Sequence, residues 1–475
     1  MVSLNFAFIK SIEINQKPFN FIEINLIAAA EPFIGEYNSH LAGFNLDFVN
    51  YYNYLVLPLK LVACWEWFER PKKEYQIIIN NVYLSFMLFL LLNMVVSLSI
   101  HIYMVWQGVM SSLDLLSEAL PQLISILIIF YFSVYKNDLY DLVEYINTNF
   151  KWHSASGVTN MTMQRSYDTA KRFAYYYTAC VAFSVTVYTI IPIANHLTTN
   201  AALPWMYNEE VNQIFFILLT RQCLAQVAIG LAIGQLGVFF VTTSILLCGQ
   251  LDLLCCSLRN VRYTGLLKRD IRHSALLSNS EEIVDDEQHR FTYNESHVES
   301  PQFHFDKVNV RLTTLDIYNP TFDEATCSAM EDCARVHQVI KEFKIMFEKF
   351  ISPLLVVRVI HCTIYLCALL YTATLKFDLA IFEYLFAVVL DMFFYCYFGN
   401  QVIIQSDRVS EAAYQSAWIT MGVRPRRLLL NILLSSRRSL IIRAGNFLAI
   451  DLQTFIRILK TSFSYYTLLV NVNEK

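Results

Sequence analysis

Charged residues are scarce in this chain of 475 residues. Asp, Glu, Lys and Arg make up 16% of the sequence, whereas 55% of it is hydrophobic and 15% is aromatic. This composition is too apolar and too aromatic for an ordinary soluble enzyme of this length. Several long windows lack charge over the ~20 residues that a membrane helix needs. The sequence therefore predicts a protein that crosses a membrane several times.

Signatures of catalysis and of metal binding are also missing. There is no Ser/His/Asp arrangement and no Gly-rich phosphate motif, so we expect neither an enzyme nor a catalytic residue. His101, His196 and His361 occur singly, without the spacing of metal ligands, so we expect no metal site. Nothing indicates a cofactor or a nucleic-acid partner. The N-terminus has no basic region followed by an apolar core, and we expect no cleavable signal peptide.

The apolar segments predict an all-α membrane protein with seven transmembrane helices. They cover residues 76–103, 115–135, 173–197, 211–251, 351–375, 379–404 and 447–472. The fourth segment is longer than a bilayer requires, so we expect one end to project into water. The fifth segment holds Arg358 and His361, and the sixth holds Glu383 and Asp391. A shorter apolar run within residues 46–70 indicates an interfacial segment, with Trp65 and Trp67 as anchors.

Four regions follow from this pattern. Residues 1–75 form an N-terminal cytoplasmic region with the interfacial segment, residues 76–258 hold transmembrane helices one to four, residues 259–349 form a cytoplasmic loop, and residues 350–475 hold helices five to seven with a cytoplasmic anchor and a pore helix. Within the loop, residues 278–320 are polar and predicted to be disordered. Residues 324–349 have helical periodicity and should continue into the fifth span. Residues 1–45 show no assignable pattern.

The distribution of positive charge predicts the topology. Of 36 Lys and Arg residues, thirty lie in the N-terminal region and in the second, fourth and sixth loops. Only two lie in the remaining loops and the tail, and four lie inside spans. The positive-inside rule then places the N-terminus in the cytoplasm. Seven spans place the C-terminus outside, a topology inverted relative to G-protein-coupled receptors.

The last apolar stretch has an unusual distribution of charge. Its second half, from Thr461, carries none, whereas its first half carries Asp451, Arg457 and Lys460. Charges at hydrocarbon depth face protein or a water-filled cavity. This pattern is typical of a pore-lining helix that is wet along one side of its first half. The alternative is an ordinary final span beginning near Thr461, which leaves too few residues to cross the bilayer.

The C-terminal part of the chain resembles the insect odorant receptors. The resemblance is carried by CYFGNQ (396–401), SEAAYQSAW (410–418), RRLLLNILLSSRRSLIIRAGNFLAIDLQTFIRILKTSFSYYTLL (426–469) and HQVIKEFKIMFEKFISPLLVVRVIHCTIYLCALLY (337–371). It implies a ligand-gated, non-selective cation channel in the plasma membrane, in the dendrites of olfactory sensory neurons. Four subunits would surround one pore, each contributing its seventh helix, and the odorant-binding subunit would assemble with a shared co-receptor.

Two features identify the type of subunit that the chain resembles. The long fourth loop and the terminal sequence of the co-receptor are not matched, since this chain has SYYTLLVNV near its end. The chain therefore resembles a ligand-binding subunit. Gustatory receptors have similar architecture and a similar final-helix motif, and they are the nearest alternative. SEAAYQSAW and the Arg-rich segment after it look more like the odorant branch.

Several roles in the pore follow from the resemblance. It implies that Leu468, Asn471 and Val472 lie at the constriction, where apolar rings gate channels by losing water. The alternative is that the apolar pair packs against lipid or a neighbouring helix. Likewise, Asp451, Arg457 and Lys460 would face the cytoplasmic vestibule, or would form salt bridges within the subunit. The basic, amphipathic run 424–443 would belong to the anchor where subunits meet, or would attract anionic lipid.

The ligand site should lie in the outer halves of spans two to six. Small-molecule sites are concave and mostly apolar, and the aromatic residues here indicate an apolar, volatile or semi-volatile odorant. The candidate contacts are Leu120, Tyr188, Ile191, Ile214, Phe215, Leu218, Tyr365, Leu369, Phe382 and Tyr384. For any one of them, packing between helices is the alternative.

Two other classes of membrane protein are disfavoured. A G-protein-coupled receptor needs an extracellular N-terminus, an Asp-Arg-Tyr triplet after its third span and Asn-Pro-x-x-Tyr in its seventh. The charge distribution and the sequence of this chain provide none of these. A secondary transporter is expected to have paired halves with broken helices, and the sequence shows no internal symmetry.

Overall fold

The computed structural model describes residues 51–105, 113–153, 162–199, 215–269, 319–375 and 379–473. The predictions for residues 1–45, and for nearly all of the polar stretch 278–320, fall outside these residues. Within them the chain is almost entirely α-helical, and its one sheet is a two-stranded hairpin. The all-α fold predicted from the sequence is confirmed.

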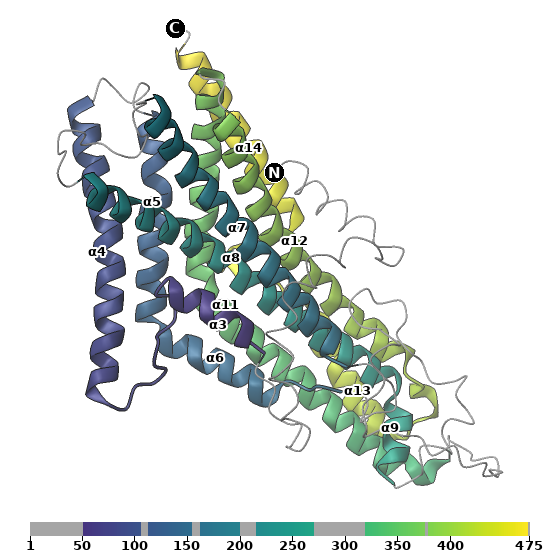
Figure 1. Ribbon diagram of the computed structural model, residues 1–475. Helices are drawn as coiled ribbons and strands as arrows, with labels where there is room; N and C mark the ends of the chain where they lie inside the picture. The colour runs from purple at the N-terminus through teal and green to yellow at the C-terminus, as the bar shows by residue number, and fades with distance from the viewer. Residues whose placement is uncertain are drawn as a thin grey trace. The chain divides into compact units, whose positions relative to one another are not determined.

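Seven long helices overlap the seven predicted spans, with some ends displaced (Figure 1). They are α4 (Glu74–Val105), α5 (Leu113–Val134), α7 (Gln164–Thr199), α8 (Phe215–Arg259), α11 (Asp323–Leu375), α12 (Leu379–Gln415) and α14 (Leu452–Asn473). Among the described residues, five helices are long and apolar enough to cross a membrane by themselves. A sixth candidate is α5 combined with α6 (Lys136–Asn149), which are bent by 69°. The helix α14 is not among them.

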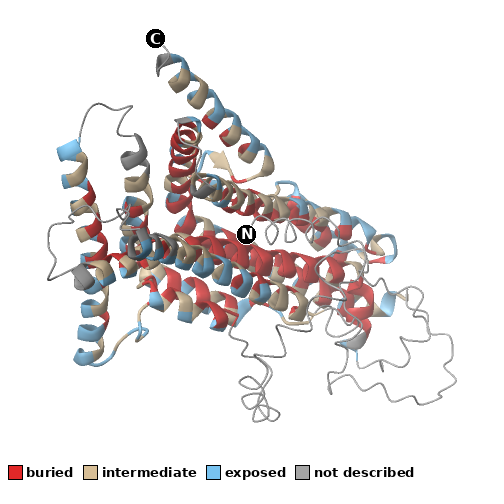
Figure 2. Ribbon diagram, turned by 45° about the horizontal axis from the view of Figure 1, so that its top comes forward, coloured by how far each residue is buried: buried red, intermediate tan, exposed pale blue. Residues whose placement is uncertain are grey.

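The centre of the bundle is α8, which is buried over most of its length (Figure 2). Its glycines let α7 approach closely, as small residues do between membrane helices. A Cβ atom at Gly230 would lie 2.3 Å from Val185, and one at Gly234 would lie 2.9 Å from Val181. With 45 residues, α8 is about 67 Å long and extends well beyond a ~30 Å hydrocarbon core. The predicted projection beyond the bilayer follows from this length.

The fifth span is part of a much longer helix. α11 has 53 residues and begins in the polar insert, so the predicted continuity of 324–349 with the fifth span is confirmed. The boundary between loop and span, placed at residue 350, therefore lies inside one helix. Below the spans, α11 packs against α9 (Val261–Leu267), α6 and α13 (Val423–Ser436).

The segment before α4 differs from the expected interfacial anchor. α3 (Asn53–Leu61) packs against α7 and α8, and the hydroxyls of Tyr52 and Thr243 lie 2.7 Å apart. The side chain of Trp65 is only 4% exposed, and its Nε1 donates a hydrogen bond to Glu69. Trp67 remains 37% exposed. The prediction that Trp65 is an interfacial anchor is therefore wrong, because the loop folds back and buries its ring.

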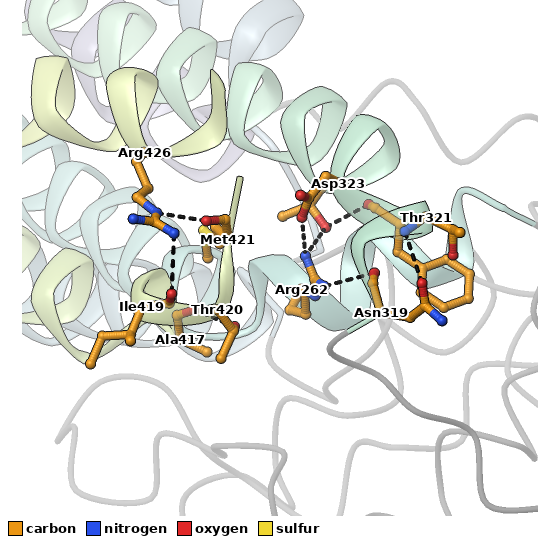
Figure 3. Close-up of polar contacts among 11 residues, drawn as sticks. Arg262, Asn319, Thr321, Asp323, Ala417, Ile419, Thr420, Met421 and Arg426 are labelled. Carbon is orange, nitrogen blue, oxygen red and sulfur yellow. Dashed lines mark hydrogen bonds and ion pairs between the residues drawn. The ribbon is translucent and has the colours of Figure 1, made fainter. Parts of the chain in front are cut away.

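A polar junction joins the starts of α11 and α13 (Figure 3). Arg262 on α9 is 2% exposed; it donates to Asp323 at 2.8 Å and to the carbonyl oxygen of Asn319 at 3.1 Å. A Cβ atom at Gly422 would lie 2.5 Å from Oδ2 of Asp323. Arg426 on α13 donates back to the turn that includes η7 (Trp418–Thr420). Asp323 follows η6 (Pro320–Phe322). It is thus held against Arg262 of α9 on one side and against Gly422, just before α13, on the other.

The basic run 424–443 is helical only in its first part. α13 ends at Ser436 and buries Leu429 and Ile432, while Arg424, Arg426 and Arg427 are exposed. Amphipathic character is confirmed for this helix. The rest of the run leads into the antiparallel hairpin of β1 (Arg443–Ala444) and β2 (Leu448–Ala449).

The last helix starts later than predicted. Phe447 lies in the hairpin turn with Gly445 and Asn446, whose φ angles are 61° and 67°. Such left-handed residues cannot continue a helix, so α14 begins only at Leu452. Oδ1 of Asp451 accepts a hydrogen bond from the backbone N–H of Thr454 at 2.7 Å. Asp451 therefore caps the helix and precedes its first turn.

Candidate functional site

Three of the predicted ligand contacts lie together in the half of the bundle where α7 ends and α12 begins. The rings of Tyr188 on α7 and Tyr384 on α12 meet edge to face, 5.5 Å apart. Tyr365 on α11 is 8% exposed and interacts electrostatically with both. Glu118 on α5 interacts electrostatically with Tyr188 and with Tyr365. We call Glu118, Tyr188, Tyr365 and Tyr384 the tyrosine cluster.

Apolar side chains from α4 and α8 close one side of this cluster. Tyr188 packs against Met94 and Ala225, and Leu219 and Cys223 pack against the same pair. Six helices thus surround one aromatic region: α4, α5, α7, α8, α11 and α12. The arrangement is mostly apolar with a few hydroxyls, as small-molecule sites are.

The other predicted ligand contacts have varied surroundings. Leu369 is 4% exposed and lies one turn beyond Tyr365. Leu120 is half-buried, and Phe382 is 41% exposed. Ile214 falls outside the described residues, and the structure describes only the backbone of Ile191, Phe215 and Leu218. The structure therefore brings Tyr188, Tyr365 and Tyr384 together, and contact of all ten residues with a ligand remains a prediction.

A buried ion pair lies on the same helices, farther from the α11–α12 loop. Nη2 of Arg358 on α11 is 2.5 Å from Oδ2 of Asp391 on α12, and the two side chains are 3% and 8% exposed. The hydroxyl of Tyr177 donates to Oδ1 of Asp391, also at 2.5 Å. A Cβ atom at Gly237 of α8 would lie 3.0 Å from that oxygen. One carboxylate thus joins α7, α8, α11 and α12.

Sequence reasoning placed these charges in two spans but did not pair them. Charged residues inside membrane spans normally face one another or backbone carbonyls within the bundle. A positive charge in the fifth span and a negative charge in the sixth are the signal that could have predicted the pair.

His361 connects the ion pair to the tyrosine cluster. Its Nδ1 lies 2.8 Å from Nη1 of Arg358. Its ring stacks on that of Tyr365, with centroids 5.3 Å apart and an angle of 20°. The side chain is 3% exposed, and its Nε2 has no hydrogen-bond partner among the described residues. His361 was not among the predicted ligand contacts.

The last helix is attached to the bundle along one side only. The hydroxyl of Ser462 donates to the carbonyl oxygen of Thr363 on α11 at 3.2 Å. Phe455 packs against Phe393 of α12 with ring centroids 5.6 Å apart. The opposite side of α14 is exposed (Figure 2).

The exposed side of α14 carries most of the predicted pore residues. Arg457, Lys460, Leu468 and Asn471 are all exposed, and their spacing places them within one stripe of the helix. Within the described part of the chain, Arg457 and Lys460 form no ion pair. Asp451 lies outside the stripe because it caps the helix. The side chain of Val472 is not among the described ones.

A small, partly open cavity lies elsewhere in the chain. It is lined by the loop around Trp65 together with Asn80, Phe132 and Lys136, and its volume is about 30 Å³. A space of that size holds a water molecule, and an odorant does not fit.

Comparison with known proteins gives one consistent result. A family model described as 7tm Odorant receptor matches residues 120–463. The chain is 23% identical over 402 residues to Putative odorant receptor 85e of Drosophila melanogaster, covering 81% of this chain and 84% of that one. It is 25% identical over 343 residues to Odorant receptor 83a of the same species, covering 70% and 73%.

The fold also matches a solved structure. The insect olfactory receptor OR5 from Machilis hrabei, solved in complex with eugenol, aligns with a TM-score of 0.60 and 13% identity. The alignment covers 88% of this chain and 97% of that one. At this identity the match demonstrates a common fold.

Proposed function

Because the chain belongs to the 7tm odorant receptor family, we propose that it is the odorant-binding subunit of a ligand-gated, non-selective cation channel. The protein is an odorant receptor of the multi-pass membrane type. The family is one of receptors and not of enzymes. The family match favours the odorant branch over the gustatory alternative. Assembly with a shared co-receptor, in the plasma membrane of olfactory dendrites, completes the proposal.

The observation that carries the proposal is the tyrosine cluster. Residues from α5, α7, α11 and α12, far apart in sequence, place three tyrosine rings and a carboxylate in one region. The odorant of this chain would bind there, against the apolar side formed by α4 and α8. Leu120, Ile191, Ile214, Phe215, Leu218, Leu369 and Phe382 would complete the site.

The exposed stripe of α14 supports the channel part of the proposal. A charged first half and an apolar second half on one exposed side suit a helix that lines a water-filled path. Leu468 and Val472 would form the gate with Asn471 beside it, and Arg457 and Lys460 would face the vestibule. The exposed arginines of α13 would meet neighbouring subunits or anionic lipid. The N-terminal region and the loop 259–349 would then be cytoplasmic.

The decisive experiment is functional expression. The full chain is expressed in cells with and without a co-receptor, and currents are recorded against a panel of volatile compounds. Odorant-evoked, cation-selective currents that require both chains support the proposal. Equal responses without the co-receptor, or none with it when both chains reach the surface, contradict it.

A further inference from the structure

The inner end of the tyrosine cluster holds buried polar atoms that the protein leaves without hydrogen bonds. His361 is 3% exposed and Gln122 on α5 is 3% exposed. Among the described residues, Nε2 of His361 and Oε1 of Gln122 have no hydrogen-bond partner. A buried polar atom without a partner costs free energy, so such atoms point to a ligand or to bound water.

The two residues occupy the same depth on neighbouring helices. Glu118 on α5 interacts with Tyr365 on α11, and the two helices run antiparallel. Gln122 lies one turn along α5 from Glu118, and His361 lies one turn along α11 from Tyr365. In an antiparallel pair both steps go in the same direction, away from the α11–α12 loop.

A second reference level, defined by three phenylalanine rings, places the two residues at the same depth again. The rings of Phe132, Phe239 and Phe350, from α5, α8 and α11, contact one another with centroids 5.4 to 6.1 Å apart. A helix rises about 1.5 Å per residue, so toward the tyrosine cluster Gln122 lies about 15 Å from Phe132 along α5. In the same direction His361 lies about 16 Å from Phe350 along α11.

Two other buried glutamines also have an unpartnered Oε1, Gln222 and Gln235 of α8. Measured from Phe239 along α8 toward the tyrosine cluster, the same helical rise places Gln235 about 6 Å away and Gln222 about 25 Å away. Both therefore lie about 10 Å from the level of His361. Gln122 is the acceptor at the right depth.

The hydrogen-bonding character of His361 follows from its neighbour. A guanidinium only donates, so Nδ1 of His361 accepts the hydrogen bond from Arg358. An imidazole that accepts at Nδ1 is neutral and carries its proton on Nε2. Nε2–H is therefore a donor. Arg358, held by Asp391, is a positioning residue that fixes this tautomer.

We infer that Gln122 and His361 bind the hydroxyl group of an alcohol or phenol odorant. The Nε2–H of His361 donates to the hydroxyl oxygen, and the hydroxyl proton is donated to Oε1 of Gln122. The apolar remainder of the odorant extends toward Tyr188 and Tyr384. This inference rests on the proposed function and adds the chemical class of the ligand.

The pair distinguishes ligands by their functional group. An aldehyde or ether oxygen can accept from His361 but has nothing to donate to Gln122. A hydrocarbon uses neither. Each lost hydrogen bond should lower potency about three- to tenfold.

The test uses two sets of ligands with equal numbers of heavy atoms. The first is hexanol, hexanal, methoxypentane and heptane, and the second is phenylethyl alcohol, phenylacetaldehyde, benzyl methyl ether and propylbenzene. Full-length wild type and variants are expressed with the co-receptor, with surface levels matched. For each ligand the variant's half-maximal concentration is divided by that of wild type, which cancels volatility and partitioning.

Gln122→Leu should lower the potency of the alcohols about three- to tenfold and leave the potency of the other ligands unchanged. His361→Phe should lower the potency of alcohols, aldehydes and ethers and leave the potency of the hydrocarbons unchanged. His361→Gln, which keeps an acceptor for Arg358 and a donor for the ligand, should restore part of the loss. Gln222→Leu is the matched control and should change all ligands equally.

The outcomes separate this inference from the proposed function. A wild type at the surface that responds to the panel of volatile compounds but to no alcohol of either set contradicts only the assignment of the hydroxyl site, and one that responds to nothing on that panel contradicts the proposed function. A responsive wild type whose Gln122→Leu variant shifts all ligands equally, or in which Gln222→Leu shifts alcohols selectively, contradicts only the assignment of the hydroxyl site. If His361→Phe does not reach the surface, Gln122→Leu decides the question alone.

Discussion

Arg358 and Asp391 form an ion pair inside the bundle, with both side chains less than a tenth exposed. Each charge also has a neutral partner, His361 for Arg358 and Tyr177 for Asp391. Removing one charge from such a pair leaves the other buried and uncompensated, whereas replacing both with apolar groups can be neutral. The stability of the bundle therefore depends on both charges being present or both being absent.

This relationship predicts the outcome of a double-mutant cycle. Arg358→Met and Asp391→Leu should each lower the stability of the folded chain by about 3–5 kcal/mol. The double variant should recover much of the loss, because no buried charge remains. Surface labelling in cells and thermal unfolding in detergent measure the effect. A double variant no more stable than the single variants would show that the pair is not coupled.

The tyrosine cluster predicts changes in odorant response. Tyr188→Ala or Tyr384→Ala should alter which odorants activate the receptor while sparing surface expression, since each removes a ring from the proposed site. Tyr176→Ala is the control, because Tyr176 lies on the same helix and is 51% exposed. Potencies that stay within about threefold for every ligand, or roughly 0.65 kcal/mol, would place the site elsewhere.

The sequence predicts the parts of the fold that depend on composition along the chain. Runs of apolar residues locate the helices, and helical periodicity locates the start of α11. The start of α14 was missed because the preceding hairpin depends on left-handed residues at Gly445 and Asn446, which apolar patterning does not reveal. Trp65 was misplaced for a similar reason, because loops fold according to tertiary contacts.

Relationships between helices were harder to predict than the helices themselves. Tyr188, Tyr365 and Tyr384 were predicted as ligand contacts from the resemblance and from their depth, and the structure brings them together. The pairing of Arg358 with Asp391 needs the rotation of two helices about their axes. The free Nε2 of His361 needs side-chain geometry. Neither follows from a single sequence.

The junction between α9, α11 and α13 predicts a different kind of stability effect. Arg262 is nearly fully buried and bonds to Asp323 and Asn319 (Figure 3). Arg262→Met should remove both hydrogen bonds, leave the carboxylate of Asp323 without this cationic partner and destabilise the folded chain by about 1–3 kcal/mol. Lys268→Met, which removes an exposed pair with Asp332, should cost at most about 1 kcal/mol. Thermal unfolding in detergent compares them, and equal effects would contradict the special role of Arg262.

The charge distribution predicts the sidedness of the two ends. An N-terminal epitope tag should be labelled only after permeabilisation, and a C-terminal tag should be labelled on intact cells. The physical reason is the excess of Lys and Arg in alternate loops. Labelling of the N-terminal tag on intact cells would refute the topology, whatever the result at the other end.

The last prediction concerns the gate. Leu468 is 57% exposed on the side of α14 that faces away from α11 and α12. In the proposed pore this residue would belong to the apolar ring that closes the channel by excluding water. Leu468→Ser should make the constriction easier to hydrate and destabilise the closed state relative to the open one. In the proposed assembly the co-receptor supplies other subunits, so the effect should be partial, with raised resting current or higher odorant sensitivity.

Asn471→Ala is the matched comparison, because Asn471 lies one turn away on the same stripe. It should change ion permeability with little effect on resting current, since a polar side chain beside the path does not seal it. Both variants are recorded with the co-receptor at matched surface levels. If Leu468→Ser leaves resting current, odorant sensitivity and permeability ratios unchanged, α14 does not line the constriction. Its exposed stripe would then be a packing surface for lipid or for a neighbouring subunit.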